Sequence, residues 1–184
     1  MAGRPPIDLS PAEWASLALL SERPAHGFAV ARALAPGGEV GRVWSCSRPL
    51  VYRALAVLTE AGLVEERGSE PGDAGPRRRV LGATRSGRRE VARWLRTPAA
   101  HVRDLRSDLM LKLLFLSRRG EDASALLAEQ QAALQPVVEG LEAAAGRADG
   151  FDRVLYLWRL ESARAALRFV EDVSLEARAV SPSP

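Results

Sequence analysis

The chain has 184 residues, of which 47% are hydrophobic and 27% are charged, a composition typical of a folded protein with a substantial core. No stretch approaches the roughly 18 consecutive apolar residues of a membrane-spanning helix, and the first residues lack the apolar segment of a signal peptide. The single cysteine, Cys46, excludes an intramolecular disulfide. We therefore expect a cytoplasmic protein that does not associate with a membrane.

The charge is unevenly distributed along the chain. Residues 1–98 contain 15 arginines and 10 acidic residues, whereas residues 99–184 contain 11 basic and 13 acidic residues. The first half is therefore basic and the second half is slightly acidic. A basic region of this kind favours a polyanionic partner.

The first helix is predicted from its N-terminal capping pattern. Ser10 and Glu13 have the S-x-x-E spacing in which each side chain accepts a hydrogen bond from the other residue's backbone N–H. The helix should begin at Pro11 and end near Ser21, because the residue before Pro24 is biased out of the helical conformation.

A short second helix is expected to start around residues 25–27 and to end before the Pro36-Gly37-Gly38 run. Its apolar residues are Phe28, Val30, Ala31 and Leu34. His26 lies at its start, where the imidazole either caps and packs against the helix or lies beside N–H groups that can bind a phosphate. Both interpretations remain open.

The third helix has a clear start and stop. Ser47 is expected to cap it by accepting a backbone hydrogen bond, and Pro49 fits its first turn. Gly62 is placed to adopt the left-handed conformation that ends a helix. The helical spacing puts one apolar face inward, made of Val51, Ala54, Leu55 and Leu58. The opposite face carries Arg48, Tyr52 and Arg53.

A β-hairpin follows the third helix. Leu63 and Val64 should be extended, residues 65–75 have the Gly/Pro composition of a loop, and residues 76–81 form a basic return strand. A further helix capped by Thr84 should run to Thr97-Pro98, where we place the end of the first domain.

Three helices followed by a hairpin predict a winged helix-turn-helix domain over residues 1–98. In such domains the third helix enters the major groove and the wing reaches the phosphate backbone. Arginine both reads guanine and clamps phosphate, so the pattern does not assign a role to each arginine. The alternative for these side chains is a merely solvated helix face. The candidate DNA-binding residues are His26, Ser47, Arg48, Pro49, Tyr52, Arg53, Arg77, Arg78 and Arg79.

Residues 99–184 are predicted to form a second domain of long helices, over about residues 103–118, 122–145 and 151–178. Apolar stripes this wide need a packing partner. Candidate dimerisation residues are Leu109, Leu113, Phe151, Leu155, Trp158 and Phe169. Trp94, Phe115 and Trp158 are candidates for an effector site, although aromatic residues at helical spacing are also typical of a core.

Several segments in order resemble the PadR family of bacterial transcriptional regulators. They read LALLSERPAHGF, GRVWSCSRPLVYRALAVLTEAGLVEE, GPRRRV and TRSGRREVARWL, and are followed by residues 105–116. The resemblance implies a dimeric DNA-binding repressor of its own or an adjacent operon, acting on an inverted-repeat operator. It also implies C-terminal dimerisation helices that often sense a small molecule, commonly an aromatic or cationic one.

Other classes of function are less well supported. The sequence contains no nucleophile–base, P-loop or metal-ligand motif, so we expect no enzyme activity and no cofactor or metal. Cys46 lies beside a helix N-terminus, which would lower its thiol pKa and suit a redox sensor, although an incidental cysteine is the simpler interpretation. The main alternative is a winged helix that binds another protein without sequence-specific DNA binding.

Overall fold

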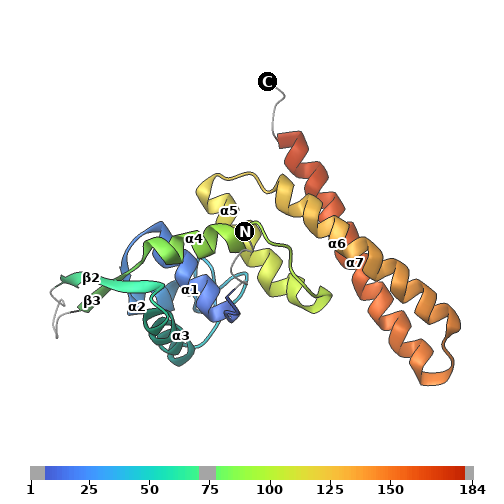
Figure 1. The fold of residues 1–184 in the computed structure, drawn as a ribbon, viewed down its shortest axis with the longest axis horizontal. Coiled ribbons are helices and arrows are strands. Elements are labelled where there is room, and N and C mark those ends of the chain that lie inside the picture. Colours follow the sequence, from blue (N-terminus) through green and yellow to red (C-terminus); the bar gives the residue numbers. More distant parts are fainter. Residues whose placement is uncertain (1–6, 71–77, 181–184) are drawn as a thin grey trace, which may run out of the picture. The chain divides into compact units, whose positions relative to one another are not determined.

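The structure is a computed structural model that describes residues 7–70 and 78–180 (Figure 1). The chain divides into two compact units, Met1–Trp94 and Leu95–Pro184. The first is a winged helix with a three-stranded sheet and the second is entirely helical. This confirms the predicted fold class, which is mainly α with a small β wing. Among the described residues, no helix is long and apolar enough to cross a membrane.

Helix α1, Pro11–Glu22, begins with the predicted capping box. The Glu13 carboxylate accepts from the Ser10 backbone N–H at 2.7 Å, and the Ser10 hydroxyl accepts from the Glu13 N–H at 3.4 Å. Its buried side chains include Leu17 and Leu20, which place α1 in the centre of the first unit.

The second helix starts within the predicted range, but a short strand that the sequence did not predict precedes it. Ala25–His26 form a short strand, β1, and helix α2 covers Gly27–Ala33. Strand β1 pairs antiparallel with β3 (Arg78–Ala83), with Ala25 opposite Leu81. A two-residue strand has no periodicity of its own, and its partner lies far along the chain, so local pattern could not reveal it.

Helix α3, Arg48–Glu60, buries Val51, Ala54, Leu55 and Leu58 as predicted. Gly62 follows it with φ of +68°. Ser47 is the N-cap residue, but its side chain makes no capping hydrogen bond, which corrects that expectation. A capping hydroxyl accepts from the second or third N–H of the helix, and Pro49 at the second position has none, which leaves the Leu50 N–H as the one possible donor.

The wing is longer than predicted. Strand β2 spans Val64–Glu70, so most of the expected loop is extended and paired with β3, which is the central strand of the order β1-β3-β2. The ladder is irregular between Glu66 and Gly68, where a bulge absorbs one residue. A charged, exposed strand lacks the apolar alternation that identifies strands in a sequence. Residues 71–77, with the predicted contact Arg77, lie outside the described residues.

Helix α4, Arg85–Trp94, ends before the predicted Thr97-Pro98. Thr84 caps it as expected, because its hydroxyl accepts from the Gly87 N–H at 3.0 Å. The same hydroxyl donates to the Gly62 carbonyl oxygen at 2.9 Å, and the Thr84 N–H donates to the Leu63 carbonyl oxygen at 2.9 Å. One residue therefore joins the end of α3 to the start of α4.

Gly87 brings α4 against this joint. A Cβ atom at position 87 would lie 2.2 Å from the Leu63 carbonyl oxygen. Backbone atoms cannot move aside as a flexible side chain can, so only glycine fits here.

We expect Gly87→Ala to lower the free energy of unfolding of the first unit by about 1–3 kcal/mol, because overpacking against a fixed carbonyl forces the helix outward. Urea unfolding of the full chain measures this. Arg88→Ala, at an exposed position of the same helix, is the matched control and should change stability by less than about 0.5 kcal/mol. Equal effects of the two substitutions would contradict the close approach of α4.

The second unit begins with a 3₁₀ turn at Val102–Asp104 and a π-helical turn at Leu105–Leu109. Helix α5, Met110–Arg119, ends at Gly120 in the left-handed conformation. Helices α6, Ser124–Arg147, and α7, Gly150–Val180, lie side by side and are joined by two residues (Figure 1). Val138, Leu160 and Ala163 lie in the core between them.

Two buried polar side chains hold the first residues of this unit. Lys112, the single lysine of the chain, donates to the Thr97 carbonyl oxygen at 2.7 Å and pairs with Asp108. Burial lowers the pKa of Lys112, and the Asp108 carboxylate opposes this shift. The Gln130 amide accepts from the Ala99 N–H at 2.7 Å and donates to the Ala99 carbonyl at 3.2 Å. Residues 97–99 are thereby fixed to α5 and α6.

We expect Lys112→Ala to destabilise the second unit by about 2 kcal/mol. The substitution removes the ammonium group that donates to the Thr97 carbonyl and the Asp108 carboxylate, and it leaves a cavity. Thermal unfolding followed by circular dichroism measures the loss. Ser117→Ala, at an exposed position of α5, should leave the midpoint nearly unchanged. A stable Lys112→Ala protein would mean that residues 97–99 are held by other contacts.

Candidate nucleic-acid interface

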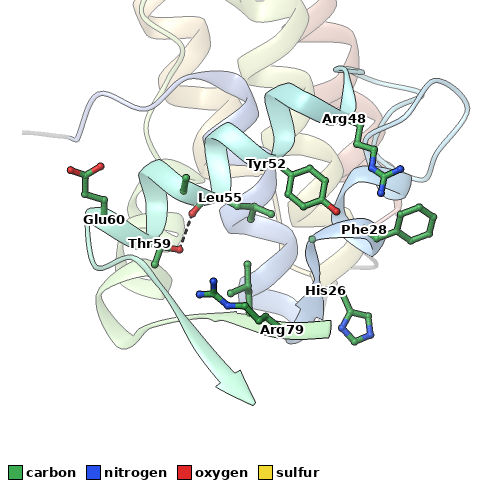
Figure 2. A pocket seen from close by; sticks show the side chains of 11 residues that line it. His26, Phe28, Arg48, Tyr52, Leu55, Thr59, Glu60 and Arg79 are labelled. Carbon is green, nitrogen blue, oxygen red and sulfur yellow. Dashed lines mark hydrogen bonds between the residues drawn. The ribbon is translucent and has the colours of Figure 1, made fainter. Parts of the chain in front are cut away.

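A groove with a volume of about 920 Å³ runs along the first unit between α3 and β3, and is called the α3–β3 groove below. Its walls come from the start of α2, one face of α3 and the central strand of the wing (Figure 2). Its lining residues are His26, Gly27, Phe28, Arg48, Tyr52, Leu55, Ala56, Thr59, Glu60, Arg79 and Leu81.

Arg48 and two aromatic rings form one end of the groove (Figure 2). The Arg48 guanidinium carbon lies 5.0 Å from the centroid of the Phe28 ring and 5.8 Å from that of Tyr52. Both rings are nearly half exposed, at 48% and 44%. Cation–π contacts therefore restrict an arginine side chain that begins the exposed end of α3.

Gly27 determines how closely α2 approaches α3. A Cβ atom at position 27 would lie 2.9 Å from Cε1 of Tyr52 and 3.3 Å from Cδ1 of Leu55. The absence of a side chain lets the Tyr52 ring lie over the start of α2, directly before Phe28. This contact brings aromatic residues from two helices to the same end of the groove.

The opposite wall carries a cation from the wing. Arg79 is 68% exposed and its Nε donates to the Glu66 carboxylate at 2.7 Å. An exposed ion pair of this kind contributes between zero and about 1 kcal/mol, so Arg79 can exchange Glu66 for another anion at little cost.

The predicted DNA-binding residues fall into three groups. The groove is lined by His26, Arg48, Tyr52 and Arg79. Ser47, Pro49 and Arg53 are exposed at the start of α3 but are not part of its lining. Arg78 is the first residue of β3, and Arg77 lies outside the described residues.

Phe28 is one of several lining residues that the sequence analysis does not predict as site residues, because its apolar character places it with the inward side of α2. Val30 and Ala31 are buried, whereas Phe28 is exposed. Residues two apart on a helix do not share a face, so the spacing of Phe28 and Val30 indicates that they cannot both point into the core.

Comparison with known families gives the strongest link to function. Residues 17–93 match the transcriptional regulator PadR-like family. This range runs from within α1 to within α4 and contains every groove residue. This region is a PadR-like transcriptional regulator domain. A comparison with curated protein sequences finds no match.

Solved structures of similar chains come from several bacteria. The chain is 22% identical to Bacillus subtilis PadR in complex with operator DNA, covering 90% of this chain and 98% of that chain with a TM-score of 0.45. The complex of Bacillus subtilis PadR with p-coumaric acid is 19% identical, covering 96% and 99%, with a TM-score of 0.42. The Vibrio cholerae virulence activator AphA is 24% identical, covering 94% and 100%, with a TM-score of 0.38.

Cys46 precedes α3 within the PadR-like domain. Burial raises the pKa of its thiol above the ordinary value. This corrects the expectation that the helix N-terminus lowers the thiol pKa, because burial disfavours the charged thiolate. A less acidic thiol does not favour the redox interpretation.

The three aromatic residues considered for an effector site lie in different environments. Trp94, in the PadR-like domain's last helix, is buried and stacks on Trp14 with centroids 5.1 Å apart. Phe115 is completely buried in the second unit, whereas Trp158 is 72% exposed. Trp94 and Phe115 thus have the surroundings of core residues.

The candidate dimerisation residues differ in how far they are exposed. Leu109 is completely buried, and Leu113 is half-buried. On α7, Phe151 is 78% and Trp158 72% exposed. Leu155 is half-buried and Phe169 is 37% exposed.

The wing of the PadR-like domain offers a direct test of which contacts hold its structure. We expect Glu66→Gln to change the free energy of unfolding by less than about 1 kcal/mol, because the Glu66–Arg79 pair is exposed. Thr84→Val keeps the shape of the side chain but removes the hydroxyl's hydrogen bonds at the base of the wing, and should cost about 1–2 kcal/mol. Urea unfolding compares them. A larger loss for Glu66→Gln would make the ion pair a structural element.

Proposed function

We propose that this chain is a cytoplasmic, homodimeric, sequence-specific DNA-binding transcriptional regulator that represses its own or an adjacent operon. The observation that carries the proposal is the exposed first turn of α3 in a PadR-like domain, with Arg48 and Tyr52 on one wall of the α3–β3 groove and Arg79 of the wing on the other. Recognition helices contact base edges through their N-terminal residues.

The residues of this surface suit the two kinds of protein–DNA contact. Tyr52 and Arg48 can reach base edges in the major groove, while Arg53 and Arg79 are cations available for phosphate oxygens. Phosphate contacts position the protein, and base contacts specify the sequence. Both are needed for an operator-binding protein.

A second copy of the chain is the proposed partner of α7. Phe151, Val154 and Trp158 recur at helical spacing and are 78%, 59% and 72% exposed. Leu160 and Ala163, on a different side of α7, already pack in the core with α6. An exposed face with two large aromatic residues is typical of an interface.

A homodimer implies a two-fold symmetric operator. Two reading helices should contact half-sites about one or two helical turns apart, with roughly 10–10.5 base pairs in each turn. The family resemblance suggests that a small hydrophobic or aromatic effector acts on the second unit. Binding of the effector would favour a spacing of the two winged-helix domains that does not fit both half-sites.

The first test of DNA binding is a gel-shift titration of the full chain on its own upstream DNA and on scrambled DNA, at several salt concentrations. We expect preference for the upstream fragment, with affinity falling roughly as the 0.9 power of salt for each phosphate contact. Tyr52→Ala should reduce this preference about tenfold, because it removes a side chain facing the bases. Thr97→Ala, an exposed position outside the domain, is the control.

Each alternative result has a definite meaning. No binding at low salt would contradict DNA recognition and favour a winged helix that binds another protein. Equal affinity for the two fragments would contradict an operator in the upstream DNA. Unchanged binding by Tyr52→Ala would remove Tyr52 from the interface.

The dimer has an independent test in sedimentation velocity. We expect Trp158→Glu to weaken dimerisation at least about thirtyfold, because a buried tryptophan at an interface contributes about 2 kcal/mol or more. Arg168→Ala is an exposed control on the same helix and should remain dimeric. A Trp158→Glu protein that stays dimeric would place the interface elsewhere.

A further inference from the structure

We propose that Arg48 reads a guanine in the major groove and that Phe28 is the positioning residue that holds the Arg48 guanidinium for this contact. The inference rests on the proposed function, because it specifies how the same surface recognises DNA. It also separates the arginines, whose roles the sequence alone leaves open.

Arg48 differs from the other candidate cations in its surroundings (Figure 2). It lies against an aromatic ring of α2 and another of its own helix, 5.0 Å and 5.8 Å from their centroids. Arg53 has no such ring contact among the described residues, and Arg79 is paired with Glu66. The aromatic contacts therefore restrict the orientation of the Arg48 guanidinium. No such contact restricts Arg53 or Arg79 among the described residues.

Stacking on rings suits base recognition better than phosphate binding. A guanidinium is planar, and a cation–π contact with a ring leaves N–H groups at its edge available. Guanine presents two acceptors in one plane, O6 and N7, which match two such N–H groups. A phosphate can also accept from two guanidinium N–H groups, but its oxygens can be approached from several directions, so a flexible arginine serves equally well.

The position of Arg48 agrees with this role. It is the first residue of α3, at the helix end that recognition helices direct toward base edges. Within the described part of the chain its guanidinium makes no ion pair, so the donors remain available for DNA.

Phe28 otherwise lacks a structural reason to be at the surface. It is 48% exposed, while its neighbours Val30 and Ala31 are buried. Packing against Arg48 gives this ring a function that an aliphatic residue could not supply, because only an aromatic face attracts a cation.

The experiment selects DNA in vitro with the full chain, from duplexes carrying a randomised core, and compares wild type with Arg48→Ala, Arg48→Lys, Phe28→Leu and Arg53→Ala. We expect a wild-type motif with one guanine per half-site whose preference falls about tenfold or more in both Arg48 variants. Phe28→Leu should reduce the same preference partly, and Phe28→Tyr should restore it. Arg53→Ala removes the same charge from the same helix, and should weaken binding to all sequences alike.

A second arm uses the selected duplex with 7-deazaguanine at that position, which lacks N7. Wild type should lose affinity, whereas Arg48→Ala should bind both duplexes equally. If Arg48→Ala keeps every guanine preference and only its overall affinity falls, Arg48 is a phosphate contact and the inference is wrong. If wild type selects no motif, the proposed function itself fails, and the inference fails with it.

Discussion

The geometry of the α3–β3 groove depends on the joint between α3, the wing and α4. Thr84 connects the carbonyl groups of Gly62 and Leu63 to the first turn of α4 through hydrogen bonds of 2.9–3.0 Å. Gly87 allows α4 to pack against the same Leu63 carbonyl. Because β3 ends at Ala83, directly before Thr84, this joint fixes the position of the wing relative to α3. The α3–β3 groove lies between α3 and β3, the two elements that this joint holds in place.

A second close approach completes the surface. Gly27 lets the Tyr52 ring lie against the start of α2, and Phe28 follows at the end of the groove where Arg48 begins α3. The proposed division of labour follows from these surroundings. A stacked arginine has few orientations and suits a base edge, whereas an exposed cation on the wing suits the phosphate backbone, whose affinity depends on charge more than on orientation.

Much of this fold could be predicted from local chemistry. The Ser10–Glu13 capping box, the inward face of α3 and the left-handed Gly62 depend on residues within one or two turns, so the sequence pattern reveals them. Strand β1 could not be predicted, because its two residues depend on pairing with distant Leu81 and Val80. The missing Ser47 cap depends on the exact positions of the backbone N–H groups near it, and the raised pKa of Cys46 depends on its burial. Neither can be read from residue types alone. Arg48 and Tyr52 could be proposed from helix position, but their contact with Phe28 required the packing of two helices.

Hydrogen exchange of the full chain, with and without a duplex of its own upstream DNA, tests the central claim most directly. The account predicts slower exchange of backbone amides at the start of α2, in the first turns of α3 and along β3, with a matched scrambled duplex giving a weaker effect at the same salt concentration. Protection confined to α6 and α7, or no protection anywhere at low salt, would contradict the claim that the α3–β3 groove is a DNA-binding surface.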